Sequence, residues 1–227
     1  MEGKENKQQG GAFQKVALAI ILSIAIMIVI SLILSCFVDD KTKQVSNVKE
    51  TKKTGEPKIE EMFLTPNKYS RPQIELKKIK GIVVHYTANP GSTAKDNRNY
   101  FENLKNKKNR YASSHYVIGL KGEIVQCIPL TEISYASNDR NSDTVSIECC
   151  HKDTSGKFNK KTYQSLVELV AWLCGQYNLK SEVIIRHYDV TGKQCPKYYV
   201  EHEDEWEQFK KDIFEYINGN ADEEEKK

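Results

Sequence analysis

Hydrophobic residues are distributed unevenly along the chain. Residues 16–38 are almost entirely apolar and carry no charge, whereas residues 39–61 are charged and polar and contain no aromatic side chain. From residue 63 onwards, apolar positions recur at intervals typical of alternating strands and helices. The pattern therefore predicts five regions: a cytoplasmic tail (1–15), a transmembrane signal anchor (16–38), a disordered linker (39–62), a folded domain (63–218) and a disordered acidic tail (219–227).

The apolar run at residues 16–38 is long enough to cross a membrane as one helix, which needs roughly 20 residues. A cleavable secretory signal is an alternative, but its apolar part normally covers only about 7–15 residues and ends in small residues. No such site follows the run, so an uncleaved anchor is favoured over a signal peptide or a buried soluble helix. A loose lipobox ending at Cys36 is a further alternative, and lipidation there would also tether the chain to a membrane.

Charges on either side of the run predict its orientation. Lys4, Lys7 and Lys15 precede it, and Asp39 and Asp40 follow it directly. Because positive charge favours the cytoplasmic side, we expect a single-pass protein of the cell membrane with its large domain on the extracytoplasmic side. The polar residues that follow cannot bury enough apolar surface to fold, so they predict a flexible tether.

The folded domain alternates between strand and helix patterns, and Lys121-Gly122 predicts a hairpin between two of the strands. Helix patterns cover residues 92–104, 161–177 and 206–217, with Ser92 or Thr93 as a cap of the first. Strand patterns cover residues 82–84, 114–120, 123–128, 144–150 and 183–185. The order predicts an α/β fold in which helices flank a central sheet.

Length and charge limit the classes of function. The 227 residues allow one sizeable domain with extensions, and the formal net charge is only +3. A chain so close to neutral gives no general basis for binding nucleic acid. We expect a monomeric catalytic domain without a nucleic-acid partner.

Two of the predicted strands end near a histidine. His85 follows the strand at residues 82–84, and His187 follows the strand at residues 183–185. Cys195 comes eight residues after His187, and a loop of that length can bring the two side chains together. Two imidazoles and a thiolate are good zinc ligands that leave a fourth position for water, as hydrolases require. This spacing alone is weak, because histidines of this kind also occur as packing residues.

Four segments make the pattern more specific. Between about residues 64 and 214 the chain resembles the zinc-dependent N-acetylmuramoyl-L-alanine amidases of type 2, which share a fold with peptidoglycan recognition proteins. The segments occur in the family's order: GIVVHYTANPGSTA (81–94), SSHYVIGLKGEIVQCIP (113–129), SDTVSIECC (142–150) and RHYDVTGKQCP (186–196). The resemblance implies hydrolysis of the amide bond between N-acetylmuramic acid and L-alanine in peptidoglycan, with Zn²⁺ as cofactor.

Carried over residue by residue, the resemblance assigns roles to five side chains. It makes His85, His187 and Cys195 the metal ligands. Glu148 becomes the general base, and its place on the strand face opposite the apolar residues agrees with that role. Lys193 becomes the group that stabilises the oxyanion.

Substrate-binding residues are less well defined by the sequence. His115 either contacts substrate or packs beneath the site, and we assign it to the substrate together with Tyr86 and Asn89. Tyr135 is a further groove candidate, and packing or turn roles are alternatives for these residues. Some phage relatives have a catalytic tyrosine where this chain has Ser114, which shifts the expected proton transfer to Glu148.

Other readings of the same residues stay open. Relatives that bind peptidoglycan without cutting it typically lack one of the ligands, and a thiol hydrolase would use Cys195 as nucleophile and His187 as base. Cys149, Cys150 and His151 could form a second metal site. Disulfides and free buried thiols are both compatible with the remaining cysteines, which are Cys127, Cys149, Cys150 and Cys174.

Overall fold

The computed structural model of the protein describes Met27, Thr51 and residues 53–224. The predicted cytoplasmic tail (1–15) and, apart from Met27, the predicted membrane span (16–38) lie outside the described residues. Within the described part, no helix has both the length and the apolar character needed to cross a membrane.

One mixed sheet of six strands forms the centre of the domain. The strands are β1 (Ile59–Glu61), β2 (Gly81–Tyr86), β3 (Tyr116–Ile118), β4 (Ile124–Gln126), β5 (Thr144–Cys149) and β6 (Ile184–Arg186). Their order is β1-β4-β3-β5-β2-β6, and every neighbouring pair is parallel except the β3–β4 hairpin. The predicted strands and the hairpin at Lys121-Gly122 are confirmed, although β3 and β4 are shorter than their sequence patterns.

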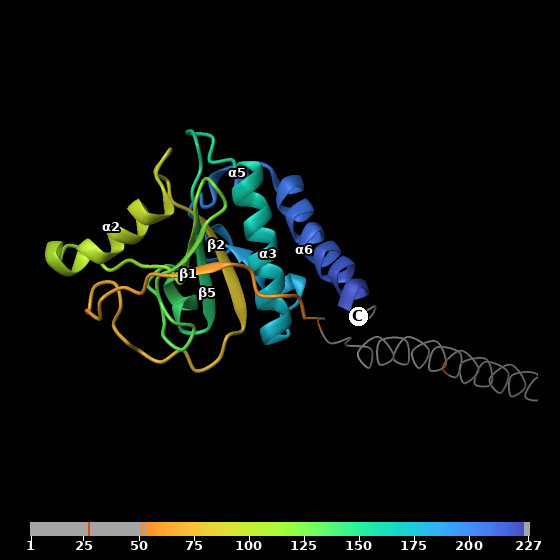
Figure 1. The fold of residues 1–227 in the computed structure, drawn as a ribbon, viewed down its shortest axis with the longest axis horizontal. Helices are drawn as coiled ribbons and strands as arrows, with labels where there is room; N and C mark the ends of the chain where they lie inside the picture. The colour runs from red at the N-terminus through yellow and green to blue at the C-terminus, as the bar shows by residue number, and fades with distance from the viewer. Residues whose placement is uncertain (1–26, 28–50, 52, 225–227) are drawn as a thin grey trace, which may run out of the picture. The chain divides into compact units, whose positions relative to one another are not determined.

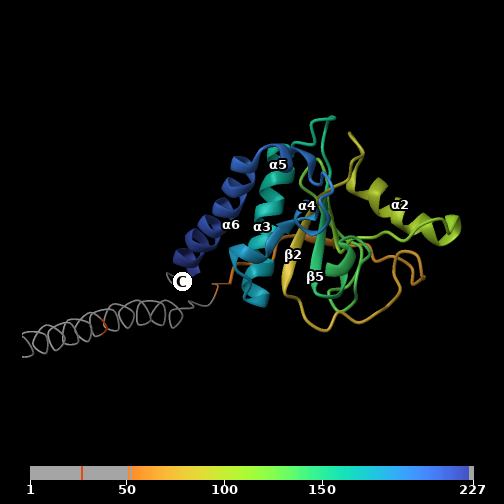
Figure 2. The same ribbon diagram turned by 180° about the vertical axis from the view of Figure 1, so that it is seen from behind.

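Helices cover both faces of this sheet (Figures 1 and 2). Helices α3 (Lys160–Tyr177) and α6 (Glu203–Glu224) lie on one face, and α2 (Ala94–Lys107) lies on the other. Successive side chains of a strand point to opposite faces, so β5 and the residue after it serve two cores. Val145 and Ile147 belong to the core under α3 and α6, whereas Cys150 packs with Phe101 and Leu104 of α2. The prediction of a central sheet flanked by helices is confirmed.

Local signals set where the long helices begin. Thr93 Oγ1 accepts a hydrogen bond from Asp96 N (3.1 Å) and Thr93 N donates to Asp96 Oδ2 (3.0 Å), which is a capping box at the start of α2. Asn159 Oδ1 accepts from Lys161 N (2.9 Å) at the start of α3. The cap predicted at residue 92 or 93 is therefore Thr93.

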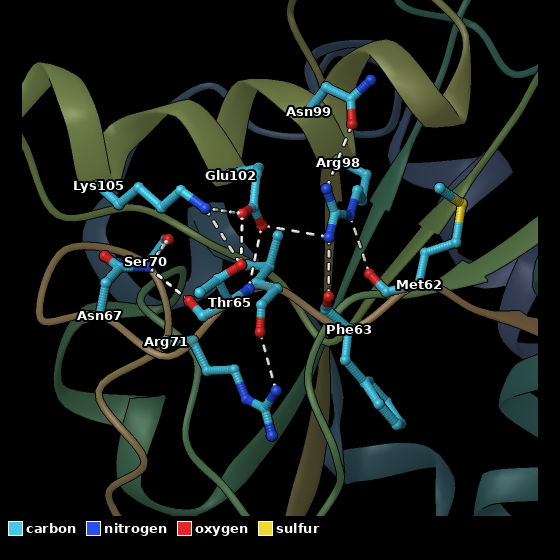
Figure 3. A network of polar contacts seen from close by, with 11 residues as sticks. Met62, Phe63, Thr65, Asn67, Ser70, Arg71, Arg98, Asn99, Glu102 and Lys105 are labelled. Carbon is cyan, nitrogen blue, oxygen red and sulfur yellow. Dashed lines mark hydrogen bonds and ion pairs between the residues drawn. The ribbon is translucent and has the colours of Figure 1, made fainter.

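Hydrogen bonds from α2 fasten the segment that follows β1 (Figure 3). Arg98 Nε donates to Met62 O (2.9 Å), and Arg98 Nη2 donates to Phe63 O (2.7 Å). Thr65 donates to Glu102 from its backbone N (3.0 Å) and from Oγ1 (2.7 Å). Residues 62–65 are thus held by a defined set of contacts with one face of α2.

Lys105 also pairs with Glu102 in this network. Burial raises the pKa of Glu102, but the hydrogen bonds from Lys105 and Thr65 outweigh it and lower that pKa to about 2. The carboxylate therefore stays charged over the whole physiological range and keeps the segment attached to α2.

Two predicted boundaries are corrected by the structure. Residues 59–61 fall in the predicted linker, but they form β1 because parallel pairing with β4 satisfies their backbone groups, so the linker prediction is wrong there. Thr51 N already donates to Asn178 Oδ1 (3.0 Å). At the other end, α6 continues to Glu224, so the prediction of disorder from residue 219 is wrong as far as residue 224.

Candidate metal centre and active-site cleft

Strands β2 and β5 carry the first two candidate residues. His85 and Glu148 are partners in the parallel register, so both side chains point to the face of the sheet that α2 covers. His85 is only 2% exposed. Its Nε2 lies 3.2 Å from Ser137 Oγ, just before the turn η1 (Asn138–Ser142), and this contact fixes the direction of the ring.

His187 begins the short helix α4 (His187–Thr191), directly after β6. The residue before it, Arg186, is buried and anchors this junction. Its guanidinium donates to Asp189 Oδ1 (2.8 Å) and to Tyr199 O (2.8 Å), and it lies over the Trp206 ring at 5.4 Å. Because β6 pairs with β2, the anchored junction places His187 beside His85.

Cys195 returns to the same place through a tight loop. Gly192 ends α4 in the left-handed conformation (φ 76°), which costs glycine little. Tyr188 N then donates to Cys195 O (2.9 Å). The Cys195 thiol, 2% exposed, lies 3.8 Å from His85 Nδ1.

The three predicted ligands converge. One donor atom from each of His85, His187 and Cys195 lies within 4.8 Å of the others, and the two imidazole centroids are 4.7 Å apart. His187 Nε2 donates to Asn138 Oδ1 (3.1 Å), whereas the buried His187 Nδ1 has no hydrogen-bond partner among the described residues. The donor set, two imidazoles and one sulfur, suits zinc, and the bonds at Nε2 leave both Nδ1 atoms free, that of His85 facing the sulfur.

Burial controls the charges in this group. It lowers the pKa of His85 well below its usual value, with further lowering by His187 and Lys193. Burial also lowers the pKa of His187 and raises the pKa of the Cys195 thiol to about 12. Both imidazoles are therefore in the neutral form that metals bind, and a divalent cation would be needed to deprotonate the thiol. A reactive thiolate is disfavoured in the metal-free protein, which argues against the thiol-hydrolase reading.

Glu148 lies half-buried next to this group. Burial raises its pKa to about 8, while the charge of Lys193 acts in the opposite direction. Its Oε2 atom is buried and has no hydrogen-bond partner among the described residues. A carboxylate in this state is suited to exchanging a proton near neutral pH.

A cleft joins these residues to solvent. Its lining contains the three candidate ligands, Glu148 and Lys193, with further walls from Tyr86, Tyr111, Tyr135, Asn138 and Asn141. A second hollow adjoins it and shares Glu148 and Lys193. That hollow is lined by polar groups from Asn89, Asn97 and Arg110. Lys193, Tyr86 and Asn89 therefore lie where a substrate could reach them, and their predicted roles stay predictions.

His115 does not line either hollow. Its ring is fully buried, with Nδ1 3.1 Å from Ser146 Oγ and Nε2 2.9 Å from Glu132 O. Burial lowers its pKa to about 4. The predicted substrate contact is not supported, because both ring nitrogens are already engaged inside the protein, and the packing role fits instead. Ser114 is also buried and donates to Tyr116 O (2.8 Å).

Ser137, Asn138 and Tyr111 are residues of the site that the sequence analysis did not identify. Asn138 adopts a left-handed backbone conformation (φ 52°) in the connection before β5. The polar run around it signalled a turn, but no motif linked that turn to a histidine 49 positions later. Only the folded chain places these residues against the imidazoles.

The second metal-site reading receives no support. Within the described part of the chain, His85, His187 and Cys195 form the one group of such residues close enough to share an ion. Cys149 and Cys150 point to opposite cores, and His151 Nδ1 lies 2.7 Å from Asp153 O. The cysteines of the described part are all free and buried, in agreement with the free-thiol alternative.

Comparison with known proteins adds an independent observation. Residues 75–198 match the protein family described as N-acetylmuramoyl-L-alanine amidase (Amidase_2). A probable N-acetylmuramoyl-L-alanine amidase of Bacillus licheniformis is 37% identical over 169 residues, covering 69% of this chain and 47% of the relative. The amidase BlyA of Bacillus subtilis strain 168 is 31% identical over 180 residues, covering 70% and 47%. The chain thus spans about half the length of these curated relatives.

Solved structures give the same result for the fold. A mutant endolysin from Bacillus subtilis superposes with a TM-score of 0.58 at 26% identity, covering 70% of this chain and 99% of that one. The catalytic domain of PlyG superposes with a TM-score of 0.59 at 28% identity, covering 72% and 96%. The similarity therefore extends over nearly the whole of each of these two solved chains.

Proposed function

Because the chain belongs to the N-acetylmuramoyl-L-alanine amidase family, we propose that it is a zinc-dependent hydrolase of the amide bond between N-acetylmuramic acid and L-alanine in peptidoglycan. The observation that carries this proposal is the convergence of His85, His187 and Cys195 next to the half-buried Glu148 in one cleft. Members of this family are hydrolases, and all the groups needed for amide hydrolysis line the same cavity.

His85, His187 and Cys195 would hold the metal. Bound there, zinc supplies a Lewis acid that lowers the pKa of water and polarises a carbonyl oxygen. The contacts of Ser137 with His85 and of Asn138 with His187 keep the two rings turned toward the thiol. The protein thereby provides a preformed set of donors rather than one assembled during binding.

Glu148 is the proton carrier of the proposed reaction. As its carboxylate it accepts a proton from the attacking water, a C–O bond forms at the carbonyl carbon, and the C–N bond to L-alanine then breaks. The protonated Glu148 returns its proton to the leaving amine, so the side chain ends in its starting state. Lys193 lines the same cavity and stabilises the negative charge that develops on the former carbonyl oxygen.

The test is hydrolysis of purified cell walls. The full chain should lower wall turbidity, lose that activity with a chelator and regain it when zinc is added. Mass spectrometry of fragments from defined muropeptides should find peptides with a free N-terminal L-alanine. Products cut at another bond, or activity that ignores the chelator but stops with iodoacetamide, would overturn the proposal in favour of another hydrolase. Wall binding without cleavage would favour a recognition module.

We also propose that residues 16–38 anchor the protein in the cell membrane, with residues 1–15 in the cytoplasm and the amidase domain outside. The length of the apolar run and the lysines that precede it support this arrangement. Cell fractionation should recover the full chain with membranes, and protease added to intact protoplasts should remove the domain. Recovery of the chain in the soluble fraction would refute the anchor.

A further inference from the structure

Three tyrosines form a stack that runs from the surface into the cleft. The rings of Tyr69 and Tyr111 are stacked with centroids 5.3 Å apart and an interplanar angle of 29°, and Tyr111 meets Tyr135 edge-on at 5.6 Å and 81°. Tyr111 and Tyr135 line the cleft together with His85 and Glu148. We call these three residues the tyrosine wall. It connects solvent to the candidate metal centre.

The backbone holds the tyrosine wall in place. Ala112 N donates to Tyr69 O (3.1 Å), and Ser113 N donates to Tyr135 O (3.0 Å). Tyr135 N in turn donates to Ser113 Oγ (3.0 Å). The two residues that follow Tyr111 are thus hydrogen-bonded to both of its ring partners. A ligand that lies against Tyr111, which is 59% exposed, would lose little affinity to ordering of the wall.

The two ends of the cleft differ in chemistry. Beside the tyrosine wall, Asn138 and Asn141 contribute amide side chains to the lining. The adjoining hollow shares Glu148 and Lys193 with the cleft and contains the exposed Arg110, the amides of Asn89 and Asn97 and the rings of Tyr100 and Phe101. Aromatic rings therefore line both ends, but the contacting tyrosines Tyr111 and Tyr135 are found only at the first end and the guanidinium only at the second.

The proposed substrate also has two unlike sides, with an N-acetylated sugar on one side of the bond that is cut and a peptide on the other. A pyranose ring has an apolar C–H face that can pack on an aromatic ring, while its hydroxyl and acetamido groups need polar partners. Resting on the proposed function, we propose that the tyrosine wall binds the glycan strand, with Tyr111 in contact with sugar. Tyr69 acts behind it as a positioning residue, and the peptide stem lies toward Arg110.

The test uses the tetramer of N-acetylglucosamine, which offers the sugar rings without any peptide. Isothermal titration of the zinc-loaded full chain should detect its binding. Tyr111→Ala should weaken that binding about three- to tenfold, whereas Tyr111→Phe, which keeps the ring face, should stay within about twofold. Tyr69→Ala should have an intermediate effect, because Tyr111 keeps its ring and loses only its support.

Tyr177→Ala is the matched control, since Tyr177 is an exposed tyrosine at the end of α3 and lines neither hollow. Its affinity for the tetramer should equal that of the unmodified chain. Zinc content after dialysis shows whether each variant keeps an intact site. Independently of any variant, the ring-proton NMR signals of Tyr111 and Tyr135 should shift on addition of tetramer, and those of Tyr177 should not.

Three results would overturn the tyrosine wall as a glycan site. They are an unmodified chain that does not bind the tetramer, a Tyr111→Ala variant that binds it equally well, and an equal loss of affinity in Tyr177→Ala. Because the tetramer has no amide bond to a peptide, its binding does not require amidase chemistry. A chain that binds tetramer but releases no peptide stems would refute the proposed function alone, and the reverse result would refute the wall alone.

Discussion

His85 and Glu148 occupy directly paired positions on the parallel strands β2 and β5. Their side chains therefore share one face of the sheet, so a candidate ligand and the candidate base stand side by side. Burial favours the neutral form of both: it lowers the pKa of His85 and raises the pKa of Glu148 to about 8. A divalent cation bound next to them would favour the charged carboxylate, which is the form that accepts a proton.

Replacing Glu148 with glutamine removes the proton carrier but keeps its shape. We expect the rate of stem release to fall about 10²- to 10⁴-fold while zinc content stays unchanged. Mass spectrometry of the released peptides measures the rate, and atomic absorption measures the zinc content. Glu215→Gln, at an exposed position on α6, is the control and should retain full activity. Full activity in Glu148→Gln would remove the general-base role.

The stability of the metal-free protein should depend on Glu148 and on pH. A carboxyl whose folded pKa is raised to about 8 binds more protons in the native state than in the unfolded state, so stability falls as pH rises toward that value. When the pH is raised from 6.5 to 8, the free energy of unfolding of the unmodified protein should fall by roughly 1–2 kcal/mol more than that of Glu148→Gln. His85 and His187, whose pKa values are lowered in the folded protein, affect the pH dependence of stability mainly below this window. Urea unfolding at both pH values measures this difference. The same change in the free energy of unfolding in both proteins would contradict the prediction.

Asn138→Gly should weaken zinc binding about 10- to 100-fold, because the bond from His187 Nε2 that orients the ring is lost. Glycine is chosen because it tolerates the left-handed backbone at this position. Competition with a fluorescent chelator gives the affinity. Asn178→Gly is the matched control, since Asn178 has a similar backbone conformation (φ 50°) at the end of α3. Equal affinities in both variants would show that Asn138 does not position the ligand.

Lys193→Met should lower kcat about 10²- to 10³-fold and change KM much less, because the charge is needed only when negative charge develops on the oxyanion. Lys193→Arg should recover part of the rate. Steady-state kinetics on a defined muropeptide separate the two constants. The exposed Lys180, which follows α3 and lines neither hollow, provides the control variant Lys180→Met. A change confined to KM would reassign Lys193 to ground-state binding.

Thr93→Ala removes the capping box of α2, and we expect it to lower the free energy of unfolding by about 1 kcal/mol. Thr93→Ser keeps an oxygen in the same place and should lose much less. Urea denaturation followed by circular dichroism measures both. An unchanged free energy in Thr93→Ala would mean that the contacts of Arg98 and Glu102 alone hold this helix.

Sequence patterns predicted the features of the fold that depend on residues close together in the chain. Apolar periodicity located the strands and showed that His85 and His187 each follow the end of a strand. The pairing of His85 with Glu148 depends on a register between segments far apart in the chain, which periodicity does not encode. For the same reason the sequence left two roles open for His115, whose partners are Ser146 on β5 and Glu132 in the chain between β4 and β5.

The roles of polar segments were harder to predict from the sequence. Residues 59–61 have no apolar pattern, and they become a strand only because the edge of β4 offers free backbone groups. Asn138 belongs to a run of polar residues that predicts a turn and nothing more. In both cases the partner that gives the segment its role lies elsewhere in the chain.

The sheet order also determines how the domain would respond to mechanical force. A pull on the chain from its N-terminal side would first reach the contact of Thr51 with Asn178, and then β1 at one border of the sheet. The histidines and the cysteine are carried by β2 and by the chain after β6, at the opposite border. Three strands (β4, β3 and β5) separate β1 from β2, so stretching of a tethered chain would load β1 before it reached the strand that carries His85.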